Sequence, residues 1–450
     1  MKHYIEYSNR YYSDNIFLSY KEQNITFSDF YFNVSTKSRA LTNLNVTDTS
    51  KIGILLSNPI DIIELYFSCL QLNKIPIIFP VNIRDDELQK IINVHKINVI
   101  ATEWLRKNQV KNIQNAIFFY IQELSSSFGG CSTLEFEKNI NNLDNIQSIH
   151  LTSGSTGNPK LIHLSFNKFI SSVNHWHQEI NFSSTDRYIQ WLPLNHIAGL
   201  SILIRSQLKG FETILMDKFD SKKINSEIDN GANLISIIPS MARRLLDNRS
   251  GRSFPKTLKA LIIGGDSCSE SLMKELLTYN IPIYKVYGMT ETCSGICGFW
   301  VNKNPEMLNS VGTPFHQTRI SIDDSLINIK GPTITPYDSD KVATNGKFKT
   351  SDLGHFKNRF LFIDGRADDI IISGGENISL SHIKNILLNH QKIKDVHLVV
   401  EREDHYGDKI IAYIVLKENI SVSNILDFCK QYLPENKLTK EIEIVEDILS

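Results

Sequence analysis

Residues 149–165 read IHLTSGSTGNPKLIHLS. An apolar run leads into a stretch of Ser, Thr and Gly that ends at Lys160, and an alternating LIHLS run follows, which predicts a strand, a loop and a second strand. Backbone N–H groups in such a loop can converge on a phosphate, and Lys160 would add a positive charge. The segment differs from a Walker loop, in which Ser or Thr directly follows the Lys. From these residues alone, a phosphate-binding loop and a flexible Gly/Ser turn are equally good interpretations.

The composition is that of a globular protein. The chain has 450 residues, of which 41% are hydrophobic and 22% charged, and this length suggests two or three domains. Its 48 Lys and Arg residues nearly balance its 49 Asp and Glu residues, so the net charge gives no attraction to nucleic acid. The six cysteines form no CxxC pair, which argues against a zinc site and favours reduced thiols. Because no signal-like or membrane-spanning apolar run is present, we expect a cytoplasmic protein without an integral membrane segment.

The order of apolar patterns predicts the fold class. Strand-like and helix-like runs alternate over residues 51–82 and 233–277, which is typical of an α/β domain with mostly parallel sheets. Short β-like runs separated by Gly, Pro and Asp over 310–363 indicate a β-rich subdomain. A small α+β pattern follows GRADD at 365–369. We therefore predict a large α/β domain with mixed sheets over residues 1–366 and a small α+β domain over residues 367–450.

Two further motifs carry groups suited to nucleotide chemistry. In YKVYGMTETCSG (284–295), the Tyr287 ring could stack on a base, the Thr290 hydroxyl could reach a phosphate and the Glu291 carboxylate could hold Mg²⁺. The alternative is a strand-to-helix turn with a capping Thr. In FKTSDLGHF (348–356), Asp352 could accept hydrogen bonds from ribose hydroxyls. By itself, an Asp in a turn is the better interpretation of that motif.

Two glycine pairs are weaker signals. In DGRADDIIISGGENISLSHI (364–383), Arg366 and the pair Gly374–Gly375 could contact a nucleotide or a pantetheine arm. IGGDSCSESL (263–272) resembles the attachment motif of carrier proteins, with Ser267 as the acceptor. Its place after the apolar run LKALII instead favours a nucleotide-site role for Gly264–Gly265.

The four motifs TSGSTGNPK, YGMTE, TSDLG and GRADDIIISGGENI together resemble, in order and spacing, the core motifs of the adenylate-forming superfamily. The resemblance covers nearly all of the chain. Within the superfamily, YGMTETCS, SGGENI and residues 191–210 are most similar to the o-succinylbenzoate–CoA ligases of menaquinone and phylloquinone synthesis. The resemblance implies an ATP-dependent acid–CoA ligase that uses ATP, Mg²⁺ and coenzyme A.

The resemblance also implies two half-reactions and assigns residues to them. A carboxylate attacks the α-phosphate of MgATP to give acyl-AMP and pyrophosphate, and the thiol of coenzyme A then displaces AMP. The implied catalytic residues are His196, Thr290, Glu291 and Lys160, with Glu291 as the Mg²⁺ ligand. The implied ATP- and AMP-binding residues are Thr152, Ser153, Gly154, Ser155, Thr156, Gly157, Lys160, Gly264, Gly265, Tyr287, Gly288, Thr290, Asp352 and Arg366.

Two residues are expected to face the acid. The resemblance places His196 near the acyl pocket, in substrate positioning or thioester formation, although Asn195 stands where the family often has an aromatic residue. Arg205 lies in the apolar run LSILIRSQL, where an unpaired guanidinium would be costly, so we expect it to pair with a substrate carboxylate. A buried ion pair with Asp or Glu, or an Arg head that reaches water, is an equally good interpretation.

The C-terminal region carries the remaining expectations. Asp368 matches the hinge about which the family's small mobile domain rotates, and Gly374, Gly375 and Glu376 would line the pantetheine channel. The family's final lysine block has two registers here. In the favoured one, the chain stops just before that lysine; in the other, Lys440 is the adenylation lysine.

Other functions stay open at this point. The chain could be another aryl- or acyl-CoA ligase, an adenylation domain that loads a carrier protein, or an acyl-AMP-binding remnant with weak adenylation. The family suggests a homodimer, and the small-molecule carboxylic acid is the expected partner rather than nucleic acid.

Overall fold

The computed structural model describes residues 3–43, 51–126, 140–152, 160–335, 347–373, 376–401, 409–432 and 441–446. Within these residues the largest sheet has nine strands in the order β15-β14-β13-β12-β11-β9-β10-β1-β2. The strands are β1 (Ile16–Tyr20), β2 (Gln23–Thr26), β9 (Arg187–Gln190), β10 (Glu212–Leu215), β11 (Leu234–Ile237), β12 (Ala260–Ile263), β13 (Ile283–Met289), β14 (Ser294–Trp300) and β15 (Thr313–Pro314). The strands from β13 to β1 pair in parallel, and β2, β14 and β15 add antiparallel edges.

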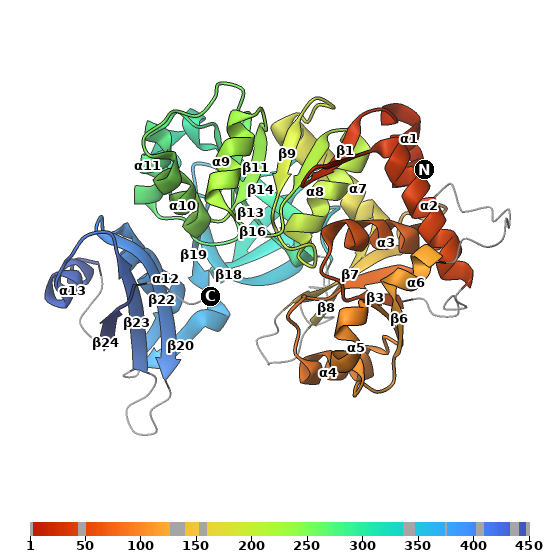
Figure 1. The fold of residues 1–450 in the computed structure, drawn as a ribbon. Coiled ribbons are helices and arrows are strands. Elements are labelled where there is room, and N and C mark those ends of the chain that lie inside the picture. The colour runs from red at the N-terminus through yellow and green to blue at the C-terminus, as the bar shows by residue number, and fades with distance from the viewer. Residues whose placement is uncertain are drawn as a thin grey trace.

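Helices cover both faces of this sheet (Figure 1). They are α7 (Phe166–Ile180) and α8 (Ile197–Lys209) on one face, and α9 (Ser221–Asp229), α10 (Pro239–Arg249) and α11 (Glu270–Thr278) on the other. Side chains alternate along each strand, so Leu234 packs with Trp176 and Ile202 while Ile235 packs with Leu272 on the opposite face. Burial on both faces explains why these strands read as continuous apolar runs in the sequence.

A second parallel sheet lies in the N-terminal part of the chain. Its order is β4-β3-β5-β6, and a separate antiparallel pair, β7–β8, lies beside β4. The strands are β3 (Lys51–Ile54), β4 (Ile75–Ile78), β5 (Val99–Thr102), β6 (Ile117–Tyr120), β7 (Ile146–Thr152) and β8 (Lys160–Ser165). The helices of this part are α1 (Tyr4–Tyr12), α2 (Phe27–Asn43), α3 (Pro59–Gln71), α4 (Asp85–His95), α5 (Lys107–Val110) and α6 (Ile121–Ser126).

A β-rich subdomain and a small α+β unit complete the described chain. The subdomain is an antiparallel sheet of β16 (Arg319–Asp323), β17 (Leu326–Lys330), β18 (Phe348–Lys357) and β19 (Phe360–Arg366). The unit contains β20 (Ile370–Ser373), β21 (Glu376–Ser379), α12 (Leu380–Asn389), β22 (Ile393–Glu401), β23 (Lys409–Leu416), α13 (Val422–Lys430) and β24 (Glu441–Ile444). It has its own apolar core, which includes Leu387, Ile414 and Ile425.

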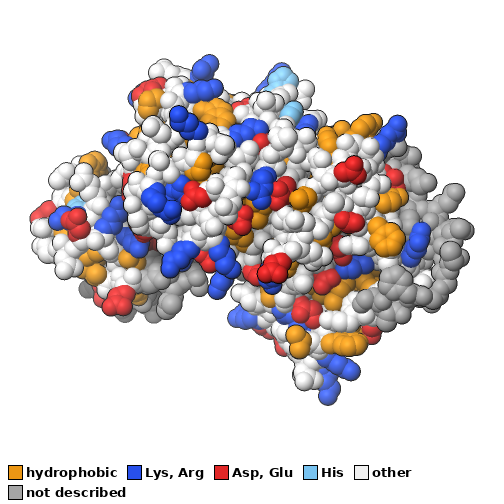
Figure 2. Space-filling model, turned by 45° about the horizontal axis from the view of Figure 1, so that its top comes forward, with side chains coloured by type: hydrophobic (Ala, Val, Ile, Leu, Met, Phe, Trp, Pro, Cys, Tyr) orange, Lys and Arg blue, Asp and Glu red, His pale blue; other side chains and the backbone are white. Residues whose placement is uncertain are grey.

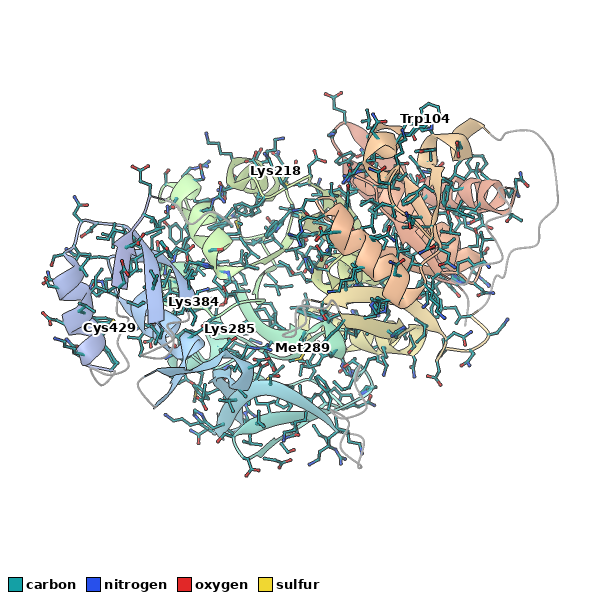
Figure 3. All side chains as sticks on the ribbon, turned by 90° about the horizontal axis from the view of Figure 1, so that it is seen from below. Trp104, Lys218, Lys285, Met289, Lys384 and Cys429 are labelled. Atoms are coloured by element: carbon teal, nitrogen blue, oxygen red, sulfur yellow. The ribbon has the colours of Figure 1, made fainter. Side chains whose placement is uncertain are left out.

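The small unit lies at one side of the large one, next to α11 and β19 (Figure 1). Lys384 of α12 reaches Asp266 at 3.3 Å across the boundary (Figure 3). The division of the chain at residues 366/367 stays a prediction.

The fold class predicted from the sequence is confirmed: a large α/β unit with mixed sheets and a β-rich subdomain, and a small α+β unit. The described part of the chain contains no helix long and apolar enough to cross a bilayer. On the face shown in Figure 2, acidic and basic side chains are interspersed, as the near-zero net charge leads one to expect.

Candidate active site

One cavity of 1360 Å³ brings the four sequence motifs together. Its described wall includes residues from all four motifs: Thr152 and Lys160 from the first, Thr290 and Glu291 from the second, Ser351 from the third, and Arg366 and Asp368 from the fourth. Gly265, Asn195 and His196 also line it. These segments lie as far as 216 positions apart in the sequence, between Thr152 and Asp368. The motifs therefore form a single site rather than four unrelated turns.

The first motif is anchored by the β7–β8 pair. Thr152 ends β7, Lys160 begins β8, and the two residues pair in register. The strand–loop–strand prediction is thus confirmed for both flanks. The predicted phosphate-binding residues Ser153, Gly154, Ser155, Thr156 and Gly157 lie outside the described residues.

The second motif lies where β13 meets β14. Met289, labelled in Figure 3, ends β13. It lines both the cavity and a smaller pocket. Thr290 and Glu291 follow in a short 3-10 turn, and the Glu291 carbonyl accepts the Thr335 amide at 2.7 Å. A Cβ at Gly288 would lie 2.1 Å from the Ser294 carbonyl oxygen, so only glycine permits this approach of the two strands.

Four side chains from three motifs form a chain of polar contacts. The Tyr287 hydroxyl donates to Asp352, and Arg366 Nη1 lies 3.4 Å from the other oxygen of that carboxylate. Arg366 also binds Asp368 through Nε at 2.8 Å and Nη2 at 2.7 Å. Burial raises the pKa of Asp352, whereas the bond from Arg366 lowers the pKa of Asp368. The arrangement fixes a buried carboxylate beside the cavity.

The Gly264–Gly265 pair follows β12 and separates the two cavities. Gly265 has φ +86° and lines both, while Gly264 lines the smaller pocket. A Cβ at Gly264 would lie 2.7 Å from Val286 Cγ1, so β12 and β13 approach closely there.

His196 occupies the N-cap position of α8. Its side chain is exposed at the cavity wall, and partial desolvation lowers the pKa of its imidazole. The ring is therefore neutral near pH 7 and can accept or donate one hydrogen bond at each nitrogen.

Arg205 lies at the smaller pocket, which has a volume of 130 Å³ and a mostly apolar lining. Its guanidinium lies 4.3 Å from the centre of the Trp176 ring, and Nη2 donates to Ser294 Oγ at 2.9 Å. Arg205 is only 2% exposed, and its Nε has no hydrogen-bond partner among the described residues.

The charge of Arg205 is poorly compensated in the described structure. The ion pairs found there include none between Arg205 and an Asp or Glu. Burial lowers the pKa of Arg205 to about 10, which still leaves it charged at neutral pH. The guanidinium is buried at this pocket and does not extend to the outer surface. A buried cation with an open donor is suited to an anionic ligand group.

Several predicted residues cannot be placed by their side chains. Gly374 and Gly375 lie outside the described residues, as does Lys440. Glu376 begins β21, but its side chain is outside the description. The roles assigned to these residues, and the hinge role of Asp368, stay predictions.

Sequence reasoning missed Trp176 and Ser294. Both line the smaller pocket and contact Arg205. A Trp within an amphipathic helix reads as a core residue, and no local signal shows that α7 and β14 place these side chains around one arginine. Only the tertiary packing reveals it.

Comparison with known proteins gives the family of the chain. A family model described as "AMP-binding enzyme" matches residues 5–330. The chain belongs to the AMP-binding enzyme family, which confirms the family predicted from the four motifs.

Two similar proteins have names that agree with each other. A 2-succinylbenzoate–CoA ligase of Bacillus cereus is 25% identical over 97% of this chain and 92% of its own length. O-succinylbenzoate CoA synthetase from Bacillus subtilis in complex with the acyl-adenylate intermediate OSB-AMP has a TM-score of 0.90 at 24% identity and covers 100% of this chain and 95% of that one. The same B. subtilis protein in complex with ATP and magnesium ion has a TM-score of 0.89 at 24% identity, covering 100% and 97%.

Proposed function

We propose that the protein is an ATP-dependent acid–CoA ligase that converts 2-succinylbenzoate to its coenzyme A thioester. The observation that carries the proposal is Arg205, a buried cation with an open donor beside the cavity that the four motifs share. 2-Succinylbenzoate has two carboxylates, and only one can become the thioester. The other needs a partner inside an otherwise apolar pocket, and Arg205 supplies it.

The nucleotide would lie along the cavity wall. Lys160 and the segment after Thr152 would hold the β- and γ-phosphates, and Thr290 would contact the α-phosphate. Adenine would lie between Tyr287 and the Gly264–Gly265 backbone. Asp352 and Arg366 would bind the ribose hydroxyls through the lone pairs and donors that their mutual contact leaves open.

Glu291 fits a role as Mg²⁺ ligand. It offers a carboxylate at the cavity wall, and the described residues contain no cluster of three or more His, Cys, Asp or Glu side chains that could hold a metal alone. Mg²⁺ commonly binds through one or two carboxylates and the phosphates of the substrate, so one carboxylate from the protein suffices. The bound ion would neutralise charge on the departing pyrophosphate.

The reaction would proceed in two steps. The acid's carboxylate oxygen bonds to the α-phosphorus as the bond to the β-phosphate oxygen breaks, which gives acyl-AMP and pyrophosphate. The thiolate of coenzyme A then bonds to the acyl carbon, and AMP leaves with the electron pair. Cations and aimed donors are needed because a carboxylate and a polyphosphate repel each other. His196, neutral at the cavity wall, would position the acyl group or assist thioester formation.

The test is a panel of acids with ATP, Mg²⁺ and coenzyme A, with AMP and thioester measured together. We expect coenzyme A-dependent AMP formation with 2-succinylbenzoate. Turnover of a fatty or benzoic acid without turnover of 2-succinylbenzoate would refute the proposed substrate. Pyrophosphate exchange with amino acids would indicate a carrier-loading domain. Use of premade acyl-AMP but not of ATP plus acid would indicate a remnant that has lost adenylation.

A further inference from the structure

His150, a residue without a role in the account above, links the first motif to the His196 loop. It lies in β7 two positions before Thr152 and is 4% exposed. Its Nε2 lies 3.0 Å from Ser148 Oγ, and its Nδ1 lies 3.3 Å from the carbonyl oxygen of Asn195. Asn195 directly precedes His196, so one imidazole connects the strand of the phosphate segment to the entry of α8.

The chemistry of these partners fixes the position of the ring proton. A carbonyl oxygen can only accept, so Nδ1 must carry the hydrogen that it donates to Asn195. Burial lowers the pKa of His150 to about 4, and a neutral ring carries only one proton. Nε2 is therefore an acceptor, and the Ser148 hydroxyl donates to it.

A buried polar network lies behind Ser148. Tyr4 donates to Gln147 Oε1 at 2.6 Å, and Gln147 Nε2 donates to the Tyr66 oxygen at 2.9 Å. Tyr66 also has a side-chain hydrogen-bond contact with Ser148. All of these side chains are at most 1% exposed. These contacts form a continuous buried path from α1 to the Asn195 carbonyl.

The carbonyl that receives this bond lies at the end of a loop that is held by hydrogen bonds. Leu192 is held at one end of the loop by Gln190, and the His196 amide closes a turn onto Pro193 at 3.1 Å. The Asn195 carbonyl is the last one before the N-cap of α8, where His196 begins to point into the cavity. Fixing that peptide fixes the backbone from which the His196 side chain projects.

We propose that His150 is a positioning residue that orients the Asn195–His196 peptide, and with it the His196 side chain, from the strand that carries the phosphate-binding segment. Only the kinetic test of this proposal rests on the proposed function. His150 does not touch the reacting atoms, and it acts through His196.

The first test is spectroscopic and independent of any substrate. In the intact protein labelled with ¹⁵N-histidine, His150 should show the pattern of the neutral Nδ1–H tautomer from pH 5.5 to 8.5, and the His150→Phe variant identifies its signals. An Nε2–H tautomer, or titration of this ring within that range, would overturn the proposal even if the enzyme acts on another acid.

The second test is a double-mutant cycle with matched variants. Asn can place an amide N–H near the position of Nδ1, whereas Phe keeps the ring volume and loses the donor. We expect His150→Phe to lower kcat about 10- to 100-fold with KM for ATP little changed, and His150→Asn to recover most of the loss. His163→Phe, on the exposed side of β8, is the control and should have kcat near that of the wild type.

The coupling between the substitutions at His150 and His196 distinguishes a positioning role of His150 from a merely structural one. In a His196→Ala background, His150→Phe should have almost no further effect on kcat. Equal losses in both backgrounds, or a loss that His150→Asn does not recover while all variants melt at the wild-type temperature, would overturn the proposal. If no acid is turned over at all, the proposed function fails, and the tautomer measurement still decides the role of His150.

Discussion

Replacing Arg205 with Leu should lower the activity of the protein and raise its stability. Removing one partner of a buried, hydrogen-bonded charge pair costs about 2–5 kcal/mol. At about 1.4 kcal/mol per factor of ten, kcat/KM for 2-succinylbenzoate should fall by about 30-fold to a few thousand-fold. Arg205→Lys should recover only part of this, because an ammonium group lacks the planar fork of parallel donors and the flat face that lies on Trp176.

The same substitution should raise stability. In the described structure the Arg205 guanidinium is buried with an open Nε and no acidic partner, so the folded state bears the cost of its desolvation. An apolar side chain removes that cost, and we expect the apparent melting temperature without ligand to rise.

Arg249 offers a matched control. It is equally buried and lies 4.3 Å from the ring centre of Phe254, but it pairs with Asp229 at 2.7 Å. Arg249→Leu should therefore lower the melting temperature, because it removes the donor to Asp229 and to the Ser253 carbonyl and leaves Asp229 only the longer pair with Arg252 at 3.6 Å. It should leave kcat/KM near the wild-type value.

The assay needs two analogues that each lack one carboxylate, 4-oxo-4-phenylbutanoate and 2-butanoylbenzoate. The analogue that is turned over keeps the reacting carboxylate and therefore lacks the one that faces Arg205. Arg205→Leu should hardly change kcat/KM for that analogue. An equal loss for the diacid and for this analogue would refute the reasoning, as would a lower melting temperature combined with unchanged kinetics.

Three further predictions concern the main cavity. Lys160→Met should raise KM for ATP about 10- to 100-fold with little change in KM for the acid, measured by initial rates, because a charged donor to phosphate is lost; equal effects on both KM values would contradict this. Glu291→Gln should raise the Mg²⁺ concentration required for half-maximal rate by about tenfold or more, measured by Mg²⁺ titration at saturating ATP; an unchanged requirement would exclude Glu291 as a ligand. The pKa of His196 is lowered, so its neutral form persists below the ordinary pKa of 6.5. The fall of kcat on the acid side of its pH profile should therefore occur below pH 6.5, and it should disappear in His196→Gln. If the fall survives the substitution, it belongs to another group.

The sequence was most informative where function constrains several short segments at once. The motifs around Lys160, Glu291, Asp352 and Arg366 predicted the family, and the structure brings all four segments to one cavity. The alternation of strands and helices likewise predicted the α/β class, because burial on both faces of a parallel sheet leaves a strong apolar signal.

Contacts between distant side chains were beyond sequence reasoning. Arg205 and Trp176 lie on different helices, and their stacking depends on how α7 and α8 pack onto the sheet. The network that ends at His150 joins α1, α3 and β7, and no spacing in the sequence marks it. Asp352 could be predicted as a nucleotide ligand, but its bond from Tyr287 could not. The nucleotide-binding role of Asp352, the hinge role of Asp368 and a homodimer stay predictions.

A crystal structure of the protein with a non-hydrolysable analogue of the 2-succinylbenzoyl adenylate would test the central claim most directly. The account predicts adenosine beside Gly265 and Asp352, the phosphate mimic within reach of Thr290, and the free carboxylate on the Arg205 guanidinium. A nucleotide bound away from these residues, or a carboxylate that points away from Arg205, would contradict it.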